Sequence, residues 1–224
     1  MRKYFSIEQV GREAHLYIFG DIVACRYGED EVSAFSFQQE LSQVDADVIH
    51  VHIDSYGGSV SEGWAIYNTL KNHPAKIVTH AEGFVASAAL YPFMAGDERI
   101  MSSVSVLFFH QVIMGCWGNA DDLRAAADQA EKLNDIGIAA FTDAGIAQEL
   151  VLQLEKADTW VSPVEALNYG FATAIIGADL HAQPNQSQSV KQEVIKTLFN
   201  QQKRTTKKEP GHSIMQMLSG IFNN

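Results

Sequence analysis

Three residues of the types used in nucleophilic catalysis occur in separate parts of this sequence: Ser87, His110 and Asp158. A serine nucleophile needs an imidazole to take its proton and a carboxylate to hold that imidazole in the right tautomer. Ser87 lies in the run GFVASAA (83–89), whose small residues would leave its hydroxyl accessible. Each residue alone also fits a structural role, as a helix-packing serine, a histidine at a strand end or an aspartate in a turn. Together they raise acyl transfer as a hypothesis.

Two consecutive glycines, Gly57 and Gly58, follow an apolar run that is typical of a strand. Consecutive glycines let the backbone approach another group and direct N–H groups outward, as stabilisation of an oxyanion requires. The alternative is a tight turn that requires positive φ, which is the commoner explanation for an isolated pair. A helix that begins near Ser87 would supply further N–H groups.

Other catalytic motifs are missing from the sequence. It has no phosphate loop, no GxGxxG after a strand, no HExxH and no Cys/His cluster. His50 and His52 would share one face of a strand, where two imidazoles can bind a metal, but no third ligand follows at a useful spacing. We therefore expect packing or surface histidines, no metal site and no cofactor. Cys25 and Cys116 have neither disulfide-framework nor zinc-ligand spacing, which favours a reducing compartment.

Composition narrows the class of protein further. The 224 residues are 46% hydrophobic and 19% charged, which fits one globular domain with an extension. No stretch approaches the roughly 20 apolar residues of a membrane span, and the N-terminus lacks the apolar segment of a signal peptide. Residues 1–177 hold 10 Lys and Arg against 24 Asp and Glu, whereas residues 178–224 hold 6 against 3. Such an acidic body argues against nucleic-acid binding.

Strand and helix patterns alternate along the chain, which predicts an α/β domain. The expected strands are 15–19, 48–53 and 76–80, with a β pair formed by 99–101 and 104–110. The expected helices are 32–44, 60–71, an apolar helix over 84–94, a long helix over 119–147 and a capped helix that ends at Gly170. We expect a compact domain over 1–177 and a polar, basic tail over 178–224. Two amphipathic tail segments, 190–199 and 214–222, either dock on a protein surface or form transient helices.

Four ordered blocks between His15 and Ile176 resemble the serine peptidases related to the Clp protease proteolytic subunit. They are DSYGGSV (54–60) with AIYN (65–68), GFVASAA (83–89), FHQ (109–111), and DTWVS (158–162) with EA (165–166) and YG (169–170). The resemblance is closest to the ClpP-like head-maturation proteases of tailed phages. Tyr56 and Val112 stand where the family commonly has proline, a difference that alters loop stiffness and removes no catalytic group.

The resemblance implies a fold and a site. The fold is the ClpP/crotonase-type right-handed spiral of ββα units with a protruding handle helix, here 119–147, through which rings pair. Ser87 would be the nucleophile, His110 the general base and Asp158 the carboxylate that orients it, with Gly58 and Ala88 donating N–H groups to the oxyanion. A flexible segment after the histidine, around Gly115 and Gly118, would pair with substrate. The implied substrate-binding residues are Gly57, Ser59, Val60, Gln111 and Val112.

The implied function is a serine endopeptidase that processes phage capsid or scaffold proteins. It would form a homo-oligomeric ring, a heptamer or a stacked double heptamer, in the bacterial host cytoplasm or the assembling prohead. One alternative is a ClpP-type subunit that depends on an ATPase partner to feed it substrate. Another is a catalytically silent ring or scaffold component. A third is an acyl-CoA enzyme of the crotonase superfamily, which the presence of all three candidate triad residues disfavours.

Overall fold

The structure is a computed structural model of the chain that describes residues 7–24 and 31–177. The tail over 178–224, with its two amphipathic segments and its basic charge, lies outside the described residues. One compact unit spans Met1–His181 and contains every element named below. In chain order, the elements are β1 (Ile7–Val10), β2 (Glu13–Phe19), β3 (Asp21–Ile22), β4 (Glu31–Val32), α1 (Ala34–Leu41), β5 (Val48–Ser55), α2 (Val60–Lys71), β6 (Lys76–Ala86), the 3₁₀ helix η1 (Ser87–Ala89), α3 (Leu90–Met94), β7 (Glu98–Ser102), β8 (Val106–Phe109), α4 (Ala120–Thr142), α5 (Gln148–Lys156), β9 (Thr159–Val161), α6 (Pro163–Tyr169) and β10 (Ala174–Ile176).

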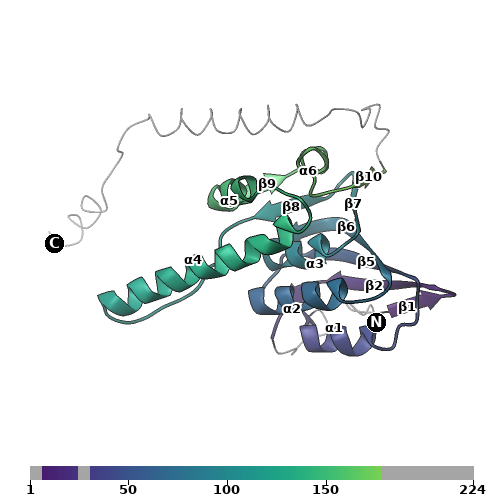
Figure 1. Cartoon of the computed structure of the whole chain (residues 1–224), viewed down its shortest axis with the longest axis horizontal. Coiled ribbons are helices and arrows are strands. Elements are labelled where there is room, and N and C mark those ends of the chain that lie inside the picture. The colour runs from purple at the N-terminus through teal and green to yellow at the C-terminus, as the bar shows by residue number, and fades with distance from the viewer. Residues whose placement is uncertain (1–6, 25–30, 178–224) are drawn as a thin grey trace, which may run out of the picture. The chain divides into compact units, whose positions relative to one another are not determined.

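The main sheet has the order β1-β2-β5-β6-β7-β10, and its central strands are parallel. Alternate residues of β5, Ile49, Val51 and Ile53, are fully buried, and helices α1, α2 and α3 cover that face (Figure 1). Alternation along a strand sends the intervening residues to the opposite face, which carries His50 and His52. This confirms the α/β class and gives the sheet one apolar and one polar face.

Strand β6 is the longest strand and has two successive neighbours. Residues Val78–Ala81 pair with β7, whereas Phe84–Ala86 pair with β8. Strand β8 in turn pairs antiparallel with β9, with Phe109 opposite Thr159. The second half of β6 thus forms a small separate branch of the sheet together with β8 and β9, and Ser87 follows directly at its end.

Two predictions about this region were wrong. The apolar run 84–94 was expected to be one helix, but β6 continues to Ala86, and a 3₁₀ turn and the short helix α3 follow. The segments 99–101 and 104–110 were expected to pair with each other, but β7 pairs with β6 and β10 while β8 pairs with β6 and β9. In both cases a long-range strand partner decided the outcome, which local pattern does not reveal.

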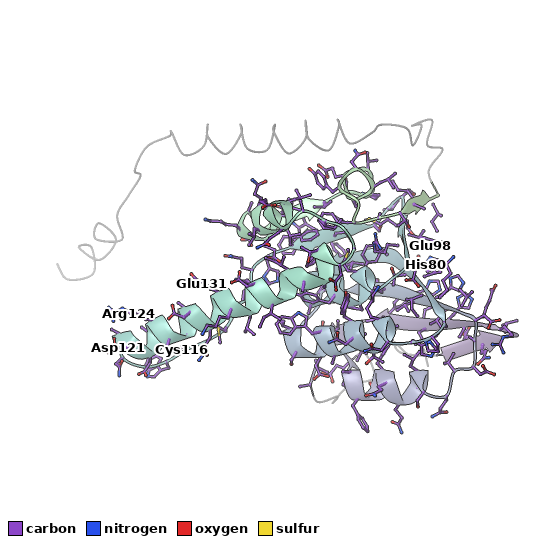
Figure 2. The ribbon with its side chains drawn as sticks, in the orientation of Figure 1. His80, Glu98, Cys116, Asp121, Arg124 and Glu131 are labelled. Atoms are coloured by element: carbon purple, nitrogen blue, oxygen red, sulfur yellow. The ribbon has the colours of Figure 1, made fainter. Side chains whose placement is uncertain are left out.

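The long helix α4 extends away from the sheet and forms the expected handle (Figure 1). Asn119 caps it by accepting hydrogen bonds from the N–H groups of Asp121 and Asp122, as its residue type predicts. Figure 2 shows Asp121 and Arg124 at its far end. The near end buries Ile138 and Phe141 against the body, and the helix ends at Thr142, earlier than the expected 147.

Two further helices follow the sequence predictions closely. Helix α2 has the predicted bounds, and α6 begins with the predicted capping box between Ser162 and Glu165. Gly170 ends α6 with a φ of +86°, a conformation that glycine adopts without strain. Within residues 7–24 and 31–177, no helix combines the length and apolar character needed to cross a bilayer.

Candidate active site

Ser87 occupies a sharp turn between a strand and a helix. Strand β6 ends at Ala86, and Ser87 begins the 3₁₀ helix that leads into α3. Its φ is +56°, in the left-handed region that non-glycine residues seldom adopt. Such backbone strain persists only where the surroundings enforce it, and it concentrates at functional sites. The turn separates Ser87 from the ladder and leaves its side chain facing a pocket.

That pocket has a volume of about 220 Å³ and is lined by several of the predicted site residues. Ser87 and His110 both line it, although 22 intervening residues separate them in the sequence. The other predicted residues in the lining are Gly58, Val60, Ala88 and Val112. Gly57, Ser59, Gln111 and Asp158 are not part of the lining. The fold therefore brings the serine and the histidine to one cavity.

The glycine pair lies directly against the serine turn. A Cβ at Gly57 would stand 2.5 Å from the Ala86 carbonyl oxygen and 2.8 Å from the Ala88 nitrogen, so only glycine fits there. Gly57 has a φ of +93°, which also favours glycine. The positive φ and the lack of space for a Cβ both require glycine at this position. An isolated tight turn would require only the positive φ.

The next residue, Gly58, forms a parallel bridge with Ile22. The two hydrogen bonds of that bridge use the Gly57 carbonyl and the Ser59 N–H, at 2.8 Å each. The N–H of Gly58 is used by neither, and it points away from Ile22. The N–H of Ala88 lies in the first turn of a helix, where backbone donors have no partner within the helix. Two backbone N–H groups are thus available at the pocket beside Ser87.

The imidazole of His110 is held by its own neighbour. Its Nδ1 lies 2.6 Å from the carbonyl oxygen of Gln111. Because a carbonyl can only accept, Nδ1 carries the proton and Nε2 keeps its lone pair. This is the tautomer that a general base requires.

Asp158 lies close to this histidine in the backbone but makes no side-chain hydrogen bond within the described residues. The last pair of the β8/β9 ladder is Phe109 with Thr159, so His110 and Asp158 are the next residues at that end of the ladder. Asp158 has a φ of +48°, a second strained position beside the site.

A residue on the handle helix fixes the chain after the histidine. Asn134 is buried, and its Oδ1 accepts a hydrogen bond from the Val112 N–H at 2.7 Å. Residues 110–117 have no regular secondary structure, so this bond is a main anchor of the segment. Asn134 was not among the residues that the sequence predicted for the site. A polar residue four positions before Ile138 on the buried side of an amphipathic helix was the available signal.

A second missed residue is Glu155 on α5, which lines the same pocket. It is 6% exposed, and its Oε2 has no hydrogen-bond partner among the described residues. Burial raises the pKa of Glu155 to about 7, because an apolar environment disfavours the charged form. Its position four residues after the buried Val151 could have indicated burial.

Comparisons with known proteins agree with one family. The model of the Clp protease family matches residues 14–179. The ATP-dependent Clp protease proteolytic subunit of Deinococcus radiodurans is 34% identical over 140 residues, which cover 60% of this chain and 68% of that protein. Subunit 2 of the same protease from Synechococcus sp. is 31% identical over 131 residues, covering 57% and 66%. The chain spans about two thirds of the length of these relatives.

Among solved structures, a ClpP1 variant from Listeria monocytogenes superimposes with a TM-score of 0.60 at 23% identity. The match covers 75% of this chain and 92% of that one. At this level of identity the likeness concerns the fold, which is the spiral α/β architecture with a handle that the sequence blocks implied.

Proposed function

Because this chain belongs to the Clp protease family, we propose that it is a serine endopeptidase in which Ser87 attacks the scissile carbonyl. The observation that carries the proposal is the meeting of Ser87 and His110 in one pocket with two backbone N–H groups. The relatives bear the name of proteolytic subunits, which supports the same activity.

The proposed mechanism uses only groups of the chain. Nε2 of His110 takes the proton from Ser87 Oγ as the serine attacks, and later gives it to the leaving amine. The N–H groups of Gly58 and Ala88 donate to the oxyanion of the tetrahedral intermediate. Water then hydrolyses the acyl-enzyme with His110 again acting as the base. The roles of these residues come from the family resemblance, and the pocket geometry supports them.

We assign Asp158 the role of orienting carboxylate. Its position beside His110 at the end of the β8/β9 ladder supports this role, although Nδ1 of His110 donates to Gln111. A rotation of the ring or a shift of the 110–112 backbone would exchange the one acceptor for the other. A carboxylate is the stronger partner once the imidazole becomes positively charged in the transition state.

A serine-reactive phosphonate probe tests the proposal on the full chain. We expect the probe to label the wild type and to leave Ser87→Ala unlabelled. The Ser87→Ala variant is a suitable control because alanine and serine have similar backbone strain at positive φ. If both proteins were labelled alike, or if neither were while both remained folded and assembled, Ser87 would not be the nucleophile.

Substrates and assembly form a narrower part of the proposal. We propose that peptide segments bind along Gly57, Ser59, Val60, Gln111 and Val112, and that the chain works as a homo-oligomeric ring. The relatives are named as subunits of an ATP-dependent protease, which supports an ATPase partner. The resemblance of the sequence blocks to head-maturation proteases favours capsid or scaffold proteins as substrates. Ser87-dependent cleavage of a co-expressed capsid protein without any ATPase would support a head-maturation protease. A strict need for a Clp ATPase would support an ATP-dependent proteolytic subunit.

A further inference from the structure

The face of the sheet opposite helices α1 to α3 carries a cluster of imidazoles. Four histidines come from three adjacent strands: His15 from β2, His50 and His52 from β5, and His80 from β6. The parallel register makes His15 the direct partner of His50, and His52 the direct partner of His80. His80, labelled in Figure 2, lies far from the handle helix α4, and the strand register puts the other three histidines on the same face of the sheet. Ser87 and its pocket contain none of these residues.

The rings contact one another closely. His52 and His80 stack with centroids 4.6 Å apart, and His15 and His50 stack at 4.7 Å. Nδ1 of His15 lies 3.0 Å from Nε2 of His52, and Nδ1 of His50 lies 2.9 Å from Nε2 of His80. His52 also stacks on Tyr17, with ring centroids 4.8 Å apart.

A carboxylate completes a possible ligand set. Glu82 is two residues after His80 on β6 and faces the same side, with Oε1 2.7 Å from Nδ1 of His52. One ligand atom each of His52, His80 and Glu82 lie within 4.8 Å of one another. The sequence spacing of His50 and His52 offered no third ligand. The neighbouring strand β6 supplies the missing ligands, because His80 and Glu82 join His52, and His50 is not part of this set.

The other two histidines are placed as outer-shell partners. Nε2 of His52 is engaged by His15, and Nε2 of His80 by His50, so each of these two rings would bind a metal through Nδ1. At His52 the metal would replace the hydrogen bond that Nδ1 makes to Glu82 Oε1. Hydrogen bonds from the far nitrogen are the usual means of fixing the tautomer and orientation of a ligating histidine. The stacked rings must turn toward a common point to reach bond lengths of about 2.0–2.2 Å, and the χ2 torsion of histidine allows this at low cost.

The electrostatics of this face favour a cation. Glu82 brings a carboxylate into the cluster, with Oε1 2.7 Å from Nδ1 of His52. Glu13 and Glu98 also act on His50, which adds negative charge around the cluster.

We propose that His52, His80 and Glu82 form a binding site for a divalent transition-metal ion of the zinc, cobalt and nickel class, with His15 and His50 as outer-shell partners. Two imidazoles and one carboxylate match the preference of these ions and are unsuited to Mg²⁺ or Ca²⁺, which take oxygen ligands. The site is separate from the proposed protease chemistry, because it lies on the opposite face of the sheet from the helices that follow Ser87.

Titration of the tag-free, chelator-stripped full chain with Co²⁺ and Zn²⁺ tests the proposal. We expect one ion per chain, with cobalt absorption bands typical of nitrogen and oxygen ligands, and a rise in Tm on binding. Mg²⁺ should give no such rise. A His52→Gln/His80→Gln variant should lose the ion. His15→Gln should keep one site with an affinity lower by roughly 10- to 100-fold, because it removes only an outer-shell bond.

Matched controls separate this cluster from the other histidines of the chain. His73→Gln, and a His181→Gln/His212→Gln double variant, should bind as the wild type does. Because the double variant in the cluster could fail to fold, Glu82→Gln provides a second test that keeps all four rings, and circular dichroism checks each protein. The proposal is overturned if the wild type binds no Co²⁺ or Zn²⁺ at micromolar concentrations, or if folded Glu82→Gln binds with unchanged stoichiometry and affinity.

Discussion

His110 follows and Asp158 precedes the last ladder pair of β8 and β9, Phe109 with Thr159, yet the proton of the His110 ring is donated to the Gln111 carbonyl. The carbonyl selects the tautomer that catalysis needs. It provides less stabilisation than a carboxylate for an imidazolium ion. The contribution of Asp158 is therefore measurable separately from the tautomer itself.

We expect Asp158→Asn to lower kcat for a peptide substrate by roughly 10- to 100-fold with little change in KM, because it removes the charge that stabilises the imidazolium while Gln111 still holds the tautomer. Steady-state kinetics on the assembled protein measures this. Asp128→Asn, on the exposed side of α4, should behave as the wild type. A loss below about threefold would show that Gln111 remains the partner of His110 throughout the reaction.

Alanine substitutions at Gly57 and Gly145 should distinguish the effect of a steric conflict on activity from the effect of backbone strain alone. Gly57→Ala adds a Cβ that contacts Ala86 and Ala88, which displaces the serine turn, and we expect kcat/KM to fall by at least roughly 10²-fold. Gly145→Ala is the matched control, since Gly145 has a φ of +81° with no atom within 4 Å of the added Cβ. It should cost about 1 kcal/mol of stability and leave activity unchanged. Equal activity in the two variants would contradict the assigned contact.

The buried carboxyl of Glu155 predicts a pH-dependent stability. Its pKa rises from 4.5 to about 7 on folding, so its protonated form is favoured in the native state. Protonated Glu155 therefore contributes fully to the free energy of unfolding below pH 4.5. This contribution, about 3 kcal/mol, is lost as the pH rises through 7. Glu155→Gln should therefore stabilise the protein at pH 8 by up to this amount and have little effect at pH 4.5. Urea unfolding at both pH values measures it.

Glu149→Gln provides the comparison for this effect. Glu149 is exposed on the same helix, so its substitution should change stability equally little at the two pH values. If the gain from Glu155→Gln were the same at pH 4.5 and pH 8, ionisation of Glu155 would not be its source.

The hydrogen bond from Val112 to Asn134 should matter for substrate binding. Asn134→Ala leaves the Val112 N–H without its acceptor, and we expect KM for peptides to rise and stability to fall by about 1–3 kcal/mol. Asn134→Asp keeps an acceptor oxygen and should recover part of the peptide affinity. Gln129→Ala, exposed on the same helix, should change neither quantity. An unchanged KM in Asn134→Ala would mean that residues 110–112 are fixed by other contacts.

The sequence was a good guide to elements whose signals are local. The cap at Asn119, the capping box at Ser162 and the end of α6 at Gly170 all depend on hydrogen bonds within a few residues, and all three are present. The identity of the family came from short blocks in order, and the family model confirms it.

Features that depend on distant strands could not be predicted. The run after Gly83 is apolar and small enough for either helix or strand, and pairing of Val85 with Ser55 and Leu107 decided for a strand. The same limitation applied to the histidines. His50 and His52 share a face as expected, but the register that places His80 beside them is set by contacts 30 residues apart.

Because Ser87 has a left-handed backbone conformation, the residue that would be most stable at this position differs from the residue proposed for activity. Glycine would relax the φ of +56° and lower the free energy of the native state, but it would remove the only hydroxyl at the turn. Alanine would retain the strain and also lose the hydroxyl. If Ser87 is the nucleophile that we propose, loss of selection for proteolysis should therefore favour glycine at this position.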